Sequence, residues 1–214
     1  DPQGNSTSGL GADKNSLEKS LYHVLLNDAQ IKDVLLKTEI ENLSLAPSNI
    51  DLIGAEVELI DAPDRERRLR ISLAAVGEEF DYVIIDCPPS LGMLTLNALV
   101  AATSVLIPVQ CEYYALEGLG QLTKTINLIR DNLNPALKIE GVLMTMADFR
   151  TNLTSEVITE ARNFFSDKVF ETIIPRSIRL SEAPGFGKSI FQYDKNSIGA
   201  QKYNALAKEM LGVK

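Results

Sequence analysis

The chain contains 214 residues, which is enough for one domain with a substantial core. With 45% hydrophobic and 23% charged residues it has the composition of an ordinary globular protein, and no apolar run approaches the roughly 20 residues of a membrane-spanning helix. The net charge of −8 argues against a protein that coats nucleic acid with its whole surface, but it leaves room for a local basic patch.

The cysteine and histidine content narrows the chemistry further. Cys87 and Cys111 are too few and too isolated for a disulfide framework, so we expect reduced thiols in a cytosolic protein. His23 is the only histidine and lies in a predicted helix, where a structural role is favoured over a catalytic one.

The first part of the chain predicts short helices and one short strand. Residues 6–11 are small and glycine-rich and predict a loop. Asn15 with Glu18 resembles an N-cap and its capping partner, at the start of a helix that continues to Leu25. Further elements are expected at residues 31–36 (helix), 43–46 (strand), 50–60 (a helix or an irregular segment) and 64–76 (helix). The last of these carries a cluster of arginines, which fits a solvated helix face or a contact with a partner or nucleic acid: Arg65, Arg67, Arg68 and Arg70.

The stretch from Tyr82 to Ser90 is the most informative part of the chain. Its apolar run, residues 82–85, is typical of a strand that is buried on both faces of a parallel sheet. Asp86 follows at the carboxyl end, where open α/β sheets bind ligands, and Pro88 and Pro89 then stop the strand. Such an acid either holds Mg²⁺ beside a nucleotide or serves as a helix-capping or turn aspartate.

The second part of the chain alternates strands and helices regularly. Strands are predicted at residues 104–109, 138–146 and 169–174, and helices at 94–101, 116–132, 156–165 and 197–210. This alternation indicates βαβ units, and therefore an α/β fold with a doubly wound, mostly parallel sheet and helices on both faces.

Four motifs carry a resemblance to a known family. They are Asp1-Pro2-Gln3-Gly4-Asn5 with residues 7–11, Ile84-Ile85-Asp86-Cys87-Pro88-Pro89-Ser90, residues 108–118, and Ile174-Pro175-Arg176-Ser177 continuing to residue 184. In this order they resemble the ParA/Soj family of chromosome- and plasmid-partitioning ATPases, and the resemblance runs from residue 1 to the C-terminus. It implies a P-loop NTPase fold with ATP and Mg²⁺ as cofactors.

The Walker A loop of the family is not found before the first motif. The family carries a Gly- and Lys-rich Walker A loop on a strand–helix unit just before Asp-Pro-Gln-Gly-Asn. We therefore expect residues 1–214 to form a single ParA-type ATPase domain that lacks this strand–loop–helix unit, and to hold metal and base but not triphosphate.

The resemblance also assigns nucleotide-site roles. Asp1 would position or polarise the attacking water, with a strand-end turn acid as the alternative, and Asp86 would bind Mg²⁺ through water. Pro175 and Ser177 match the segment that contacts adenine, although the family often has Asn at the position of Ser177. Met146 would pack on the base, or would instead be an ordinary core methionine.

The resemblance implies a DNA surface as well. Arg150 and Arg179 match family positions implicated in sequence-independent DNA binding, and the planar guanidinium suits phosphate. The alternative is an ion pair within the chain, with Asp148 or Glu182. Lys188 and Lys195 would widen the same patch.

The implied function is ATP-dependent partitioning of DNA. ATP would drive a sandwich homodimer that binds nucleoid DNA non-specifically in the cytoplasm, without a membrane, and a ParB-like partner would stimulate hydrolysis. One alternative is a MinD-like membrane ATPase, which carries a basic amphipathic tail, whereas here little follows Met210. The others are a non-catalytic DNA-binding or adaptor protein and an iron–sulfur relative, but the two cysteines fit buried small hydrophobes better.

Overall fold

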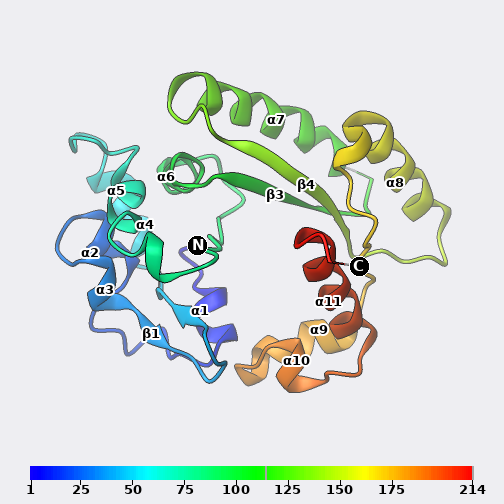
Figure 1. Ribbon diagram of the computed structural model, residues 1–214, viewed down its shortest axis with the longest axis horizontal. Coiled ribbons are helices and arrows are strands. Elements are labelled where there is room, and N and C mark those ends of the chain that lie inside the picture. The colour runs from blue at the N-terminus through cyan, green and yellow to red at the C-terminus, as the bar shows by residue number, and fades with distance from the viewer. Residues whose placement is uncertain (114, 214) are drawn as a thin grey trace. The chain divides into compact units, whose positions relative to one another are not determined.

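The computed structural model describes residues 1–113 and 115–213, with the backbone alone for 115–117, so the predicted strand-to-helix junction at Tyr114 and the end of the chain at Lys214 lie outside the described residues. The described residues divide into two compact units, which are taken in turn (Figure 1). The first contains residues 1–102 with 184–188, and the second contains residues 103–183 with 189–214.

The first unit is mainly helical. Its elements are α1 (Asn5–Gly9), α2 (Leu21–Leu25), α3 (Ile31–Val34), β1 (Leu36–Lys37), β2 (Ser44–Leu45), α4 (Leu52–Glu58), α5 (Arg68–Leu73), a 3-10 turn (Gly77–Glu79) and α6 (Met93–Ala101). β1 and β2 form an antiparallel pair. Leucines from α2, α4, α5 and α6 meet in one buried cluster, which holds these short helices together. The uncertain segment 50–60 is therefore a helix.

The start of α2 corrects the predicted helix boundary. The helix begins at Leu21 rather than after Asn15, because Ser20 supplies the cap. The Ser20 hydroxyl accepts a hydrogen bond from the Tyr22 amide (3.3 Å), and His23 Nδ1 accepts one from the Ser20 amide (3.1 Å). This reciprocal capping box satisfies two amides that a helix start leaves without partners. The structural role predicted for His23 is confirmed.

The predicted strand at 82–86 is wrong for the part of the chain that the structure describes. No described segment forms a β-ladder with it, and the Ile84 side chain is 93% exposed. A strand requires a neighbour for its backbone hydrogen bonds, and without one these apolar residues remain an extended segment. Asp86 nevertheless follows this segment as expected.

The second unit contains the parallel sheet. Its elements are β3 (Ser104–Gln110), α7 (Ala115–Asn132), β4 (Lys138–Thr145), α8 (Asn152–Phe165), a 3-10 turn (Ser166–Lys168), α9 (Ile178–Glu182), a further 3-10 turn (Ala183–Phe186) that runs into the first unit, α10 (Ile190–Tyr193) and α11 (Ile198–Met210). β3 and β4 pair in parallel from Ser104 opposite Lys138 to Gln110 opposite Thr145. The predicted strand at 169–174 is reduced to two isolated parallel bridges, Val142 with Val169 and Ala147 with Pro175.

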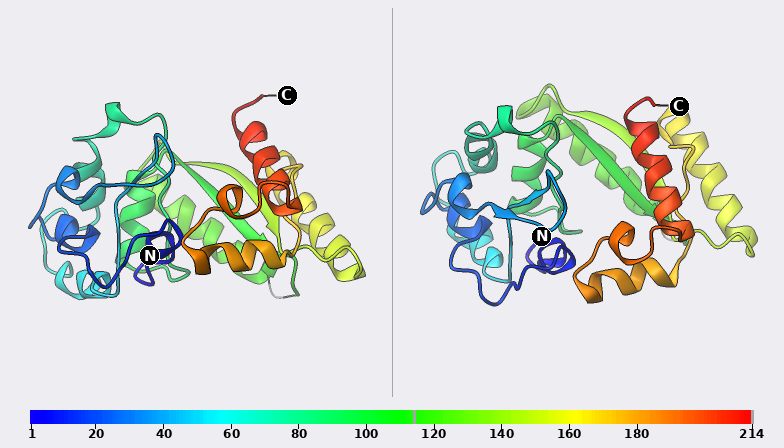
Figure 2. Two further views of the ribbon diagram at one scale, coloured as in Figure 1. Left: turned by 90° about the horizontal axis from the view of Figure 1, so that it is seen from below. Right: turned by 60° about the horizontal axis from the view of Figure 1, so that its bottom comes forward.

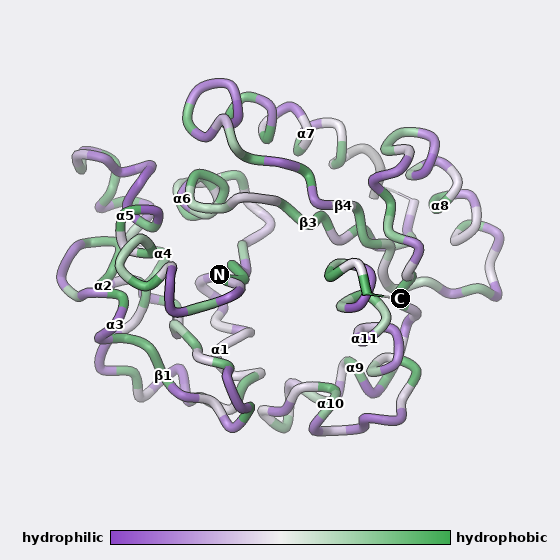
Figure 3. The backbone as a smooth tube through the Cα atoms, in the orientation of Figure 1, coloured by the Kyte–Doolittle hydropathy of each residue, from purple (hydrophilic) through white to green (hydrophobic). Residues whose placement is uncertain are grey.

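Both faces of this sheet are covered. α7 lies along one face and α11 over the other (Figures 1 and 2). Leu206 of α11 packs in a buried cluster with Leu143 and Ile174, while Val142 and Met144, which point to the opposite face, are also fully buried. The hydrophobic colour along β3 and the second half of β4 in Figure 3 shows the continuous apolar run that this burial requires. The predicted α/β fold class is confirmed.

Candidate functional site

Asp1 and Asp86 lie side by side in the first unit. The amino nitrogen of Asp1 donates a hydrogen bond to the backbone oxygen of Asp86 (3.1 Å). The Ser6 hydroxyl donates to Asp86 Oδ2 (2.6 Å), and the Gln3 amide donates to Asp1 Oδ1 (3.0 Å). The structure therefore brings together two predicted site residues that are 85 positions apart in sequence.

A buried pair of hydroxyl residues fixes the backbone of Asp1. Ser48 Oγ donates to the Asp1 carbonyl (2.7 Å), and Thr7 Oγ1 both donates to the Ser48 carbonyl and accepts from the Ser48 amide (2.9 Å each). Sequence reasoning missed Ser6, Thr7 and Ser48. The available signal was the run of three hydroxyl residues, 6–8, directly after the Asp-Pro-Gln-Gly-Asn motif.

Gly4 lets the motif approach Ser48. Its φ of +62° lies in the left-handed region, and a Cβ at this position would meet the Ser48 carbonyl oxygen at 2.6 Å. Only glycine combines this conformation with this close approach at no steric cost. The first glycine of the chain thus sets the distance between the Asp1 turn and the segment before α4.

The oxygen atoms at this site are suitable ligands for Mg²⁺. Asp1 and Asp86 contribute carboxylate oxygens and Ser6 a hydroxyl oxygen, all hard ligands. The described residues contain no group of three or more His, Cys, Asp or Glu side chains arranged to hold a metal. One or two carboxylates with several retained waters is the usual arrangement for Mg²⁺ beside a nucleotide, so the residues present fit this ion.

The predicted adenine-contacting residues meet in the second unit. The Ala147 amide donates to the Ile174 carbonyl (3.2 Å), and the Arg176 amide donates to the Ala147 carbonyl (3.0 Å), so the end of β4 lies beside residues 174–176. Met146, Pro175 and Ser177 are each half-buried there. Met146 has a φ of +54°, an uncommon conformation for a side chain other than glycine, which occurs more often at functional sites than in ordinary cores.

Both predicted DNA arginines make ion pairs within the second unit. Arg150 binds Asp148 through two nitrogens (2.8 and 2.6 Å), and Arg179 binds Glu182 (3.1 Å) and approaches Asp194 (3.6 Å). The hydrogen bonds from Arg150 lower the pKa of Asp148 from 3.8 to about 2. The Arg150 side chain is still 88% exposed. Arg179 lies in the first turn of the short helix α9.

The arginine cluster near α5 is partly structural. Arg68 is buried, and its Nε donates to the Pro63 carbonyl (3.0 Å). Arg65 donates to the Ile60 carbonyl and pairs with Glu66. The predicted solvated face therefore does not include Arg68. Both cysteines are free thiols. Cys111 is buried, as predicted, and burial raises its pKa, whereas Cys87 is exposed, so the prediction of a buried residue is wrong there.

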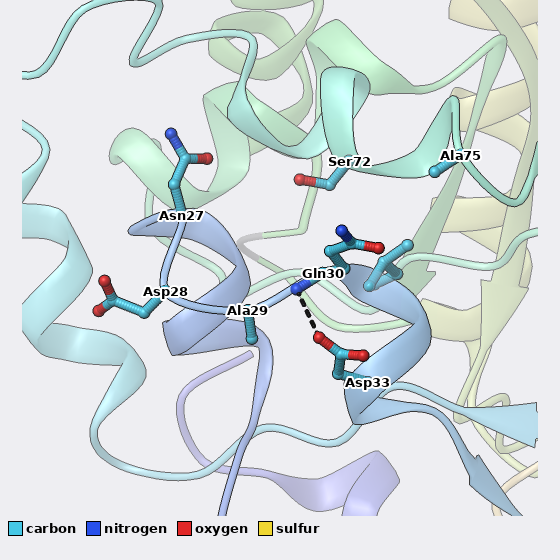
Figure 4. A pocket seen from close by; sticks show the side chains of 8 residues that line it. Asn27, Asp28, Ala29, Gln30, Asp33, Ser72 and Ala75 are labelled. Atoms are coloured by element: carbon cyan, nitrogen blue, oxygen red, sulfur yellow. Dashed lines mark hydrogen bonds between the residues drawn. The ribbon is translucent and has the colours of Figure 1, made fainter.

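A surface pocket of about 370 Å³ lies elsewhere in the first unit, between the α2–α3 turn and α5 (Figure 4). Asp33 points into this region but accepts a hydrogen bond from the Gln30 amide (3.1 Å), which caps α3. None of the predicted site residues lines this pocket. We therefore do not assign it to the nucleotide.

The parallel strands, covered by helices on both faces, define an α/β protein, and Asp1, Asp86 and their hydroxyl neighbours supply oxygen ligands that suit Mg²⁺. A family model described as "AAA domain" matches residues 1–139. Sporulation initiation inhibitor protein Soj of Bacillus subtilis is 56% identical over 98% of this chain and 83% of its own length, and chromosome partitioning protein ParA of Myxococcus xanthus is 54% identical over 99% and 75%. The chain belongs to the Soj/ParA family of chromosome-partitioning ATPases.

A solved structure supports the fold and the kind of ligand. It is described as cobyrinic acid a,c-diamide synthase from Mycobacterium smegmatis with bound ATP analogue and magnesium. It is 39% identical to this chain, covers 97% of this chain and 79% of its own, and superimposes with a TM-score of 0.84. The ATP and Mg²⁺ predicted from the sequence are the ligands of this relative. None of the helices in the described residues is long and apolar enough to cross a membrane.

Proposed function

We propose that the protein is an ATPase that partitions DNA, and that both units serve one ATPase domain. The observation that carries the proposal is the backbone hydrogen bond from the Asp1 nitrogen to the Asp86 carbonyl, which brings two distant motifs together. The identity to Soj and ParA, higher than that to the diamide synthase, favours partitioning over other ATP-dependent reactions.

Each acid has a role that its position supports. Asp1 orients the attacking water, since its carboxylate is fixed by the Gln3 amide and its backbone by Ser48. Asp86 holds Mg²⁺ through water, and Ser6 orients its carboxylate. Bound Mg²⁺ supplies charge neutralisation for the phosphates. Met146, Pro175 and Ser177 contact the adenine.

The biological setting follows the family. An ATP-dependent homodimer binds nucleoid DNA in the cytoplasm through Arg150 and Arg179, and a ParB-like protein stimulates hydrolysis. DNA phosphate must then replace Asp148 and Glu182 as the partner of each arginine. This exchange is feasible because ion pairs between exposed side chains contribute little to stability.

Substitution of Asp1 tests the proposal. In the full-length protein we expect Asp1→Ala to retain ATP binding and to lose hydrolysis, because the water is no longer oriented, whereas Asp86→Ala weakens Mg²⁺-dependent binding as well. Asp28→Ala, which removes an exposed carboxylate, is the matched control and keeps both activities. Phosphate release and nucleotide-binding titrations measure the two quantities. Unchanged turnover in Asp1→Ala would remove Asp1 from the mechanism.

A further inference from the structure

α4 carries a second apolar face that the first unit does not cover. Ile50, Ile53, Val57 and Ile60 are between 50% and 66% exposed. Their spacing of three, four and three residues places them on one side of a helix, in the pattern of a coiled-coil seam. We call these four residues the α4 stripe.

The backbone continues the helical turns beyond α4, so the stripe is continuous. The Ile53 amide donates to the Ile50 carbonyl (3.0 Å) before the helix, and the Ile60 amide donates to the Val57 carbonyl (3.2 Å) after it. The other face of α4 is fully used, because Leu52, Ala55 and Leu59 are buried in the core. A helix that is apolar on both faces is typical of a helix covered on both sides.

The charges along the stripe are mostly negative; Arg65, at its end, donates to the Ile60 carbonyl and is paired with Glu66. Residues 50–64 contain no lysine or arginine, and their acidic members are Asp51, Glu56, Glu58, Asp61 and Asp64. Hydrogen bonds hold two of these carboxylates in place, with Tyr22 Oη donating to Glu58 (2.9 Å) and the Leu94 amide donating to Glu56 (3.4 Å). An occupant of the stripe therefore meets an apolar seam with an acidic rim.

This charge selects one kind of occupant. DNA and an anionic membrane surface are repelled, and a second copy would place acidic rims against each other. A helix with an apolar face and basic flanks matches both the seam and the rim. We propose that the α4 stripe docks a basic amphipathic helix of a partner protein. This proposal does not depend on the ATPase or DNA-binding roles.

A designed peptide tests the docking on the full-length protein. The probe is a synthetic helical peptide with leucine at positions i, i+3, i+4 and i+7 and lysine on the remaining face, and the control peptide has glutamate in place of lysine. Fluorescence anisotropy measures binding. We expect the lysine peptide to bind and the glutamate peptide not to bind.

Two protein variants separate the stripe from general charge attraction. Val57→Lys lies in the stripe, and Ile71→Lys makes the same charge change on α5 at a side chain that is 58% exposed. We expect Val57→Lys to weaken peptide binding at least tenfold and Ile71→Lys to leave it unchanged. Ile50→Lys provides a second stripe variant, and circular dichroism verifies that each variant is folded.

Several outcomes would overturn the proposal. Equal binding by Val57→Lys and Ile71→Lys would place the peptide elsewhere, and equal binding of both peptides would remove the charge argument. Absence of peptide binding to the full-length protein would show that the stripe is already covered. If Val57→Lys dissociates an assembly of the parent protein in sedimentation, the occupant is a second copy.

Discussion

At the scale of single residues, local hydrogen bonds rather than long-range charge set the behaviour of the acids. Asp148 accepts two bonds from the Arg150 guanidinium and one from the Arg150 amide. Glu209 likewise accepts the amides of Glu171 and Thr172, and these hydrogen bonds lower its pKa even though its partial burial acts to raise it. Donors aimed at a carboxylate favour its charged form.

The Asp148 pair gives a prediction for its titration. Because its folded pKa is about 2, lower than its ordinary value of 3.8, the pair stabilises the fold above pH 4, and this contribution is lost as the pH falls toward 2. We expect the carboxyl carbon of Asp148 to remain that of a carboxylate at pH 3 in an NMR titration. In Arg150→Ala its midpoint should rise toward 3.8, whereas Arg162→Ala should leave it unchanged. An ordinary midpoint in the parent would contradict the pairing.

At the scale of elements, turns and caps position the site more than the length of any helix does. α1 has only five residues, yet the glycine before it and the hydroxyls within it bring Asp1 to Ser48 and Asp86. The acids are thus fixed by a turn whose geometry depends on one backbone conformation.

Replacement of Gly4 tests this dependence. We expect Gly4→Ala to lower the free energy of unfolding by about 2 kcal/mol, because alanine is strained at positive φ and its Cβ would meet the Ser48 carbonyl. Gly118→Ala in α7 is the matched control. A Cβ there meets nothing within 4 Å, so alanine should be neutral or stabilising in the helix. Denaturant unfolding measures both variants. A Gly4→Ala protein as stable as the parent would show that the turn can move away from Ser48.

Sequence patterns predicted the second unit better than the first. The apolar runs of β3 and β4 and the amphipathic α7, α8 and α11 are strong periodic signals, and their bounds agree within a few residues. The strands at 82–86 and 169–174 had the same signal but lack a full ladder, because strand formation depends on neighbours that local sequence does not encode. The sequence predicted the helix cap at Asn15, whereas the structure has it at Ser20. Both positions offer a good capping residue, so the local sequence does not distinguish them.

The candidate site was predictable only in part. The motifs pointed to Asp1 and Asp86, and the ion pairs of Arg150 and Arg179 were foreseen as alternatives. The hydrogen bonds between Thr7 and Ser48 were not predicted, since two hydroxyl residues 41 positions apart give no periodic signal. The apolar residues of the α4 stripe were visible in the sequence, but their exposure was not.

At the scale of the whole molecule, the charge balance confines the proposed DNA binding to a local patch. The chain carries 29 acidic and 21 basic residues, so its overall field repels DNA. Arg150 and Arg179 are both exposed but are neutralised locally by their carboxylate partners. We expect a monomer with two such arginines to bind DNA weakly, whereas the proposed dimer would double the contacts on linked patches and gain from effective concentration without new interactions.

Charge reversal at these arginines tests the DNA role. In the full-length protein with ATP, we expect Arg150→Glu or Arg179→Glu to abolish DNA binding while ATP binding and dimerisation persist. The loss should be similar for unrelated DNA sequences, because phosphate contacts carry no base information.

The milder Arg150→Ala should flatten the dependence of log affinity on log salt by about one unit per lost phosphate contact. Arg162→Glu, which reverses another paired and exposed arginine, is the matched control and should keep DNA binding. Biolayer titrations at several salt concentrations measure the DNA affinity and its dependence on salt. If the two reversals bind DNA as well as the parent, the patch lies elsewhere, and Arg67 and Arg70 near α5 become the next residues to reverse.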